Sequence, residues 1–177
     1  MLRLALTAVL CLCAFAVTDC KRAGADAPNA PVQPNASAHR SAPVGGFASR
    51  GGDACEKYLT PAVVSAILDG ATEPAKKLSA QGCEVRTVDG GGSISITLNA
   101  ASPQAFDAYQ KYLSNPTPLA GVGDRAVQSM TGISSIKGNN EGCDIDAGGA
   151  PGSLKLHGAE LGARLGDICN RIYADAK

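Results

Sequence analysis

The stretch CEVRTVDGGGSISITL, residues 83–98, contains the clearest local folding signal in this chain. Residues 83–88 and residues 93–98 each alternate apolar with polar side chains, the pattern of a β-strand with one buried face. The segment Asp89-Gly90-Gly91-Gly92 separates the two runs, and a glycine-rich turn favours the reversal of direction in a β-hairpin. The sequence therefore predicts an antiparallel hairpin over this stretch.

A helix is predicted on each side of the hairpin. Thr60-Pro61 combines a good N-cap residue with a proline suited to the first helical position, and apolar residues at helical spacing follow. This predicts a helix over about 61–69. Ser102-Pro103 repeats the signal, and the second helix is expected to end before Asn115-Pro116.

The C-terminal third of the chain predicts further strands and a last helix. Two short strand candidates lie at about 125–130 and 132–137, and residues 143–147 alternate like a third. Ser153 is the expected N-cap of a final helix that continues to about Ile172. The order α-β-β-α-β-β(-β)-α predicts an α+β fold, a small antiparallel sheet with helices packed on one face.

Residues 1–19 have the features of an export signal. A short basic start, Met1-Leu2-Arg3, precedes the apolar run 4–17. That run is shorter than the stretch of about 20 apolar residues that crosses a bilayer as a helix, and it fits the apolar region of a signal peptide. Cleavage after Ala14-Phe15-Ala16 would release a soluble protein. Alternatively, Val17-Thr18-Asp19-Cys20 resembles the bacterial lipoprotein box, in which the cysteine takes the lipid.

The number of cysteines favours the lipid anchor. Outside the apolar run five cysteines remain, and an odd number in an exported chain requires an explanation. Lipidation of Cys20 would leave four for two disulfides. Residues 20–52 are rich in Ala, Pro, Gly, Ser and Asn without apolar periodicity, so they predict a disordered tether. Residues 53–177 are then the single folded domain.

The four remaining cysteines are expected to form structural disulfides. They allow three pairings, of which we favour Cys55–Cys83 with Cys143–Cys169, because each then joins neighbouring elements. An export signal indicates an oxidising compartment, where disulfides persist. The mature chain has no Cys-x-x-Cys pair, which argues against a zinc site or a redox dithiol.

Candidate catalytic and nucleotide-binding residues are few. His157 could belong to a Ser-His-Asp triad, but no serine occupies a Gly-x-Ser-x-Gly elbow, and a surface or capping role is the simpler interpretation. Gly121–Ala126 fits Gly-x-Gly-x-x-Ala, yet no strand precedes it, so it predicts a turn leading into a strand. No catalytic residue and no cofactor is therefore expected.

Asp144 and Asp146 are the acidic pair considered for metal binding. Two residues apart on a strand, they are expected to share a face, with Glu141 and Asn139 nearby. Calcium-loop spacing and its closing glutamate are missing, so a solvated strand face is expected and no metal.

Gly158, Gly162 and Gly166 recur at helical spacing in the last predicted helix. These glycines form a stripe without side chains on one face of the helix, which predicts close approach of this helix to the sheet. A docking groove for a partner helix is the alternative.

Composition excludes some classes of function. Sixteen basic and sixteen acidic residues give zero net charge, which argues against nucleic-acid binding. The absence of Trp, with only four Tyr and three Phe, argues against large stacking platforms for bases or sugars.

Cys55-x-x-x-Leu59-Thr60-Pro61, the cysteine at 83 and Leu119-Ala120-Gly121-Val122-Gly123-Asp124-x-Ala126 together resemble a family of small exported bacterial lipoproteins. These are described mainly from actinobacterial cell envelopes, and their domain has no known function. More distantly, the chain is similar to extracellular sensor domains of bacterial receptor kinases. The resemblance covers about residues 53–175. It implies an α+β domain with two disulfides and a binding role at the cell surface, and it supplies no catalytic residues.

The sequence thus predicts a non-enzymatic, exported envelope domain, lipid-anchored to the membrane through Cys20, that binds a ligand or a partner envelope protein. A periplasmic hydrolase or hydrolase inhibitor, and a structural envelope component, are the alternatives. The expected location is the periplasm or the cell surface, membrane-anchored in the first case and soluble or secreted if cleavage releases the chain at Val17.

Overall fold

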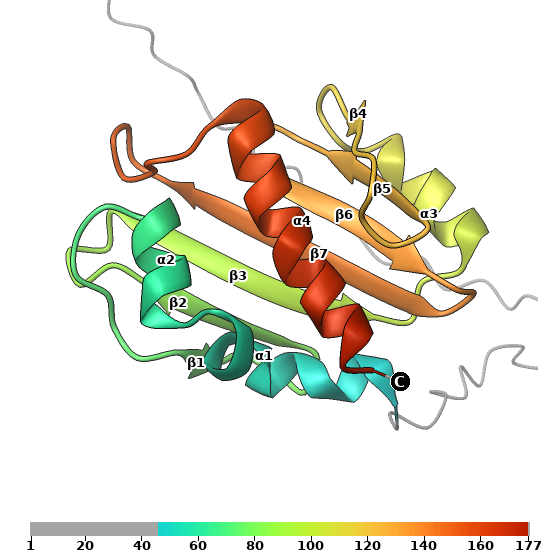
Figure 1. Cartoon of the computed structure of the whole chain (residues 1–177), viewed down its shortest axis with the longest axis horizontal. Helices are drawn as coiled ribbons and strands as arrows, with labels where there is room; N and C mark the ends of the chain where they lie inside the picture. Colours follow the sequence, from blue (N-terminus) through green and yellow to red (C-terminus); the bar gives the residue numbers. More distant parts are fainter. Residues whose placement is uncertain (1–45, 177) are drawn as a thin grey trace, which may run out of the picture. The chain divides into compact units, whose positions relative to one another are not determined.

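One antiparallel sheet organises the computed structural model, which describes residues 46–176 (Figure 1). The predicted export signal, Cys20 and most of the predicted tether lie outside these residues. The elements are η1 Phe47–Arg50, α1 Gly51–Tyr58, α2 Pro61–Ile67, β1 Lys76–Lys77, β2 Gly82–Arg86, β3 Gly92–Asn99, α3 Pro103–Gln110, β4 Thr117–Pro118, β5 Arg125–Gln128, β6 Gly132–Lys137, β7 Glu141–Gly149 and α4 Gly158–Ala174. This order confirms the predicted α+β class.

The seven strands follow the order β1-β2-β3-β7-β6-β5-β4. The predicted hairpin is confirmed as β2–β3, with Val85 opposite Ile94. The two longest strands, β3 and β7, pair at the centre, where Ile96 lies opposite Ile145 and Thr97 opposite Asp144. Side chains alternate between the faces of a sheet, so these two pairs lie on opposite faces.

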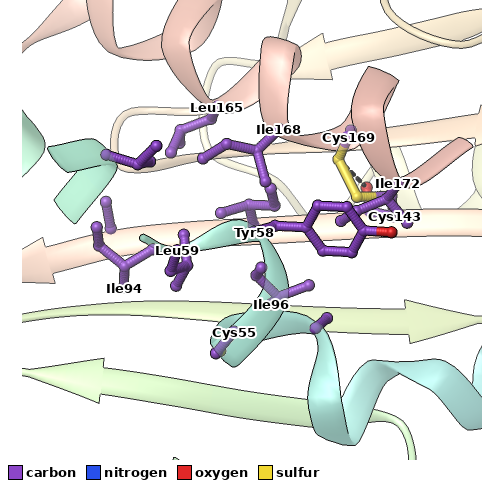
Figure 2. Packing of buried hydrophobic residues seen from close by; sticks show 14 of the residues in the cluster. Cys55, Tyr58, Leu59, Ile94, Ile96, Cys143, Leu165, Ile168, Cys169 and Ile172 are labelled. Atoms are coloured by element: carbon purple, nitrogen blue, oxygen red, sulfur yellow. Dashed lines mark hydrogen bonds between the residues drawn. A yellow bond between two sulfur atoms is a disulfide. The ribbon is translucent and has the colours of Figure 1, made fainter. Parts of the chain in front are cut away.

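The main core fills the space between one face of the sheet and α1, α2 and α4. Figure 1 shows these three helices in front of the strands. Figure 2 shows Leu165, Ile168 and Ile172 of α4 directed toward the sheet, where Ile94 and Ile96 project from β3. All five are nearly inaccessible to solvent. Burial of apolar area at about 25 cal/mol per Å² makes this layer the principal source of stability.

Helix α3 lies on the opposite face of the sheet, which corrects the prediction that all helices share one face (Figure 1). Phe106 of α3 packs with Val127 of β5 and Ile136 of β6 in a second, smaller apolar cluster. Strand β6 is therefore buried on both faces, since Ile133 belongs to the main core. This small cluster explains the position of α3, because without the helix Val127 and Ile136 would be exposed to water.

The folded elements begin earlier than the predicted boundary between residues 52 and 53. Phe47 in η1 stacks on Tyr173 of α4, with ring centroids 5.5 Å apart. Gly51 and Gly52 are buried in the first turn of α1. Glycine pairs favour loops in isolation, but here tertiary packing outweighs their low helix propensity.

Helix α4 begins at Gly158, with His157 rather than Ser153 as its N-cap residue. Ser153 instead lies in a turn, where its hydroxyl donates to the Ala150 carbonyl at 2.8 Å. The residue after it, Leu154, pairs with Leu68 in an isolated β-bridge, which keeps the chain extended before the helix.

The glycine stripe of α4 serves packing within the domain, as the sequence favoured. An added Cβ would come within 2.0 Å of the Gln128 side chain at Gly162, and within 2.5 Å of Val122 at Gly166. Gly158 is outside this contact, because its φ of 53° belongs to the turn that starts the helix.

Both favoured disulfides are present, Cys55–Cys83 and Cys143–Cys169. The first joins α1 to β2. The second joins β7 to α4 and is drawn in Figure 2. Such bonds persist in oxidising compartments outside the cytoplasm. Of the helices described between residues 46 and 176, each is too short or too polar to cross a membrane.

Candidate functional site

A pocket of about 300 Å³ lies between α3 and the polar face of the sheet. Its position follows from the connection between β3 and α3. The chain leaves β3 at Asn99, and Ser102 then caps α3 by accepting a hydrogen bond from the Ala105 amide at 3.1 Å. The helix contacts β6 and leaves a space beside β7. The lining residues are Asn99, Ala100, Ala101, Ala105, Phe106, Tyr109, Ser134, Ser135 and Asp144.

Asp144 of β7 is the one carboxylic acid among the described residues that line this pocket. Its Oδ2 accepts a hydrogen bond from Asn99 Nδ2 at 2.5 Å, and its Oδ1 accepts one from Ser134 Oγ at 2.5 Å. Burial raises the pKa of the Asp144 carboxyl, and the charge of Asp146 raises it further, while the two hydrogen bonds act in the opposite direction. The carboxyl is thus held by neutral donors in a partly dehydrated position.

Aromatic side chains of α3 form the opposite wall. Phe106 is buried, whereas Tyr109, one turn later, is 45% exposed. Burial raises the pKa of the Tyr109 hydroxyl, and the negative charges of Asp144 and Asp146 contribute. The Tyr109 side chain therefore lies within electrostatic reach of both carboxylates. One wall of the pocket is apolar and aromatic, and the other is polar and acidic.

Asp146 lies on the same face of β7 as Asp144, as expected from their spacing, but it is exposed and is not one of the residues that line the pocket. Burial also raises the pKa of its carboxyl. Glu141 and Asn139, the other members of the acidic group, instead line a separate surface cavity with Lys137. Among residues 46–176, no three His, Cys, Asp or Glu side chains are grouped to hold a metal ion.

His157 is exposed at the N-cap position of α4, and its side chain makes no capping hydrogen bond. No hydrogen bond from its ring to a serine or a carboxylate is found within the described part of the chain. The structure thus does not bring His157 together with triad partners.

The Gly121–Ala126 segment is a turn leading into β5, as predicted. Asn170 of α4 binds it: its Oδ1 accepts from the Gly123 amide at 3.1 Å and its Nδ2 donates to the Gly121 carbonyl at 2.8 Å. The backbone groups of this turn therefore hold the turn to α4.

A larger hollow, of about 510 Å³, lies along α4 and is lined by Val63, Arg164, Asp167, Asn170, Arg171 and Ala174. Asp167 and Arg171 are exposed there. Charges on exposed side chains are screened by water, so they bind ions weakly. The smaller pocket under α3 is the better candidate, because its polar groups are partly dehydrated.

Sequence reasoning missed three members of the pocket, Asn99, Tyr109 and Ser134. Asn99 and Asp144 are 45 residues apart and meet only through the pairing of β3 with β7. The available signal was weak: polar residues at alternate positions of β3 and β7, and an exposed tyrosine one turn after a buried phenylalanine.

Comparison with known proteins found no relative of this chain. No protein-family model matches the chain, and neither the curated proteins nor the solved structures contain a significant match.

Proposed function

We propose that this chain is an exported, non-enzymatic binding domain of the cell envelope that holds a small ligand in the pocket under α3. The observation that carries the proposal is Asp144, a partly dehydrated carboxyl held by Asn99 and Ser134 in a concave space with an aromatic wall. Binding sites combine apolar walls with a few oriented polar groups, and groups with perturbed pKa values gather there. The volume, about 300 Å³, is at the small end of the usual range.

The proposed location is the periplasm or the cell surface, with the domain attached to a membrane through a lipid on Cys20. The signal-like residues 1–19, the lipoprotein-like box and the pairing of the other four cysteines support this part of the proposal. So does the resemblance to small exported bacterial lipoproteins.

The intact mass of the protein isolated from its native envelope tests the anchor. A chain that starts at Cys20 with added acyl mass is expected, and Cys20→Ser should abolish the added mass and release the protein from membranes. A mature chain that starts at Val17 without lipid would contradict the anchor and leave the ligand pocket untouched.

Filling the pocket tests the binding function. Ala105 lines the pocket on α3, and Ala108 lies on the same helix outside the lining. Both are exposed, and leucine keeps a high helix propensity at either position. Thermal-shift screening of a small-molecule collection should reveal ligands for the natural chain and for Ala108→Leu. The Ala105→Leu chain should lose the same ligands. If Ala105→Leu bound every ligand unchanged, the pocket would not be the binding site.

A further inference from the structure

Asp144 in the pocket under α3 and Asp146, two residues along on the same face of β7, have no cationic partner among the described residues. Both oxygens of Asp144 accept from neutral donors, and neither Asp144 nor Asp146 takes part in an ion pair within residues 46–176. The lining contains no lysine, arginine or histidine. A partly buried carboxylate is stabilised by an opposite charge, and none is supplied by this part of the chain.

The guanidinium of Arg125, which lies beside Phe106, is engaged with another carboxylate. Arg125 of β5 pairs with Asp107 on α3, and its guanidinium lies 5.3 Å from the centroid of the Phe106 ring. Tyr109, one turn after Phe106, lines the same pocket as Asp144. A cation in the pocket is therefore attracted by the Asp144 carboxylate. It is also attracted by the aromatic wall, because the face of an aromatic ring attracts positive charge.

The polar groups around Asp144 offer few free donors to a ligand. The Oδ1 atom of Asn99 is buried and accepts no hydrogen bond from the residues described. The Nδ2 group of Asn99 and the hydroxyl of Ser134 already donate to Asp144. An anionic ligand would meet like charges and engaged donors, whereas a group that carries several N–H donors and a positive charge matches this lining.

We propose that the pocket under α3 binds the ammonium group of a small alkyl amine, with Asp144 as its counter-ion and Tyr109 beside the alkyl chain. This inference rests on the proposed binding function. Asp146 follows Asp144 on the same face, at a spacing of about 6.6 Å along the strand, and offers a second anion. An extended diamine such as 1,4-diaminobutane has a similar distance between its nitrogens. Diamines are therefore expected to bind more tightly than monoamines.

Titration calorimetry at low ionic strength tests the ligand class with the full mature chain. The probes are 1,4-diaminobutane, butylamine with one charge, the neutral 1,4-butanediol and the dianion succinate. The diamine should bind best, butylamine about tenfold more weakly, a difference of about 1.4 kcal/mol, and the diol and succinate not measurably. Equal binding of diol and diamine, or absence of binding by both amines, would overturn the inference.

Isosteric substitutions assign the two carboxylates. Asp144→Asn should weaken both amines by about tenfold or more, because it removes a partly desolvated charge partner. Asp146→Asn should weaken only the diamine, to the level of butylamine. Asp167→Asn, an exposed change of the same charge on α4, is the matched control and should change neither. Unchanged amine binding by Asp144→Asn would refute its role as counter-ion.

A measurement on the unsubstituted protein keeps the test independent of variant folding. Carboxyl NMR should show the pKa of Asp144 falling when the diamine is added, since a nearby cation favours the charged form. Asn99, Ser134, Asp146 and Tyr109 are the polar and titratable groups that face it. A pKa unchanged by saturating diamine would count against the proposal. If amines fail while Ala105→Leu still blocks another ligand, only the amine class is wrong, and the binding function stands.

Discussion

At the scale of single residues, Asp144 links the stability of this domain to pH. In the unfolded chain its carboxyl is fully hydrated, whereas in the folded domain burial disfavours the charged form and raises the pKa. The folded state then binds the proton more tightly than the unfolded state does. The resulting contribution to stability is fully present below the unfolded pKa, near 3.8, and is lost as pH rises through the folded pKa.

Replacing this carboxyl should therefore stabilise the domain at neutral pH. Asp144→Asn keeps the shape and a hydrogen-bond acceptor for Ser134, and it carries no charge to dehydrate. Its new amide group replaces the oxygen that accepts from Asn99, so the Asn99 amide must turn and accept through its Oδ1 atom, which has no partner in the natural chain. We expect its melting temperature to exceed that of the natural chain at pH 7.5, with the difference shrinking as pH falls toward 3.8. Thermal denaturation followed by circular dichroism across this range is the measurement. A difference that stays constant with pH would show that the charge of Asp144 does not contribute.

At the scale of elements, the contact between α1 and the loop before β2 depends on two glycines, Gly51 and Gly52, because any side chain there would collide with the loop. The Gly52 amide donates to the Ala80 carbonyl at 2.9 Å, which brings the first turn of α1 against that loop. A Cβ added at Gly51 would lie 1.8 Å from the Gln81 carbonyl oxygen. Because this neighbour is backbone, it cannot rotate away. The Cys55–Cys83 disulfide then holds the same helix against β2.

Gly51→Ala is expected to lower the free energy of unfolding by about 3 kcal/mol, the cost of forcing a methyl group into a filled space. Gly148→Ala is the control, because nothing lies within 4 Å of a Cβ at that position. Urea denaturation of the two variants gives the comparison. Equal stability of both would mean that α1 and the loop separate easily.

At the scale of the whole molecule, the N-terminal elements complete the main core. Phe47 packs against the core cluster and stacks on Tyr173 near the end of α4. Tyr58 at the end of α1 donates from its hydroxyl to the Asp175 carboxylate at 3.0 Å. Residues 47–58 thus connect the start of the domain to its C-terminal helix.

Shortening the chain tests where the domain begins. A chain that starts at residue 46 should keep the stability of the mature protein. One that starts at residue 53 loses the partly buried Phe47 and the first turn of α1, and it should be destabilised by about 3 kcal/mol, the lower end of the cost of removing a buried phenylalanine side chain. Calorimetric melting of both chains decides this. Identical melting temperatures would mean that the folded domain begins at residue 53, as the sequence predicted.

The Cys143–Cys169 disulfide closes a separation of 26 residues and joins the central strand β7 to α4. In the chain-entropy description, a loop of this size contributes about 3–4 kcal/mol by restricting the unfolded chain. Cys143→Ala combined with Cys169→Ala should lower unfolding free energy by that amount, with Cys55–Cys83 left intact as the internal control. A loss below about 1 kcal/mol would indicate native strain that offsets the entropic gain.

Features that depend on residues close together in the sequence could be predicted, and features that depend on residues far apart could not. The alternation in 83–88 and 93–98 and the intervening glycines are local, so the β2–β3 hairpin was predictable. The Ser102 cap was predictable for the same reason. Helix α1 was missed as a whole, because Gly51 and Gly52 oppose a helix locally and their contact with the loop 79–81 favours it.

By itself, the sequence determined the α+β class, the local hairpin, the capping of α3 and the shared face of Asp144 and Asp146. Each depends on turn chemistry or periodicity within a short window. Only the tertiary structure decided that β3 pairs with β7 and that α3 covers the far face of the sheet. These arrangements depend on the summed burial of residues far apart in the chain. The pocket follows from both, since Asn99 and Asp144 meet through the first and Tyr109 reaches them through the second.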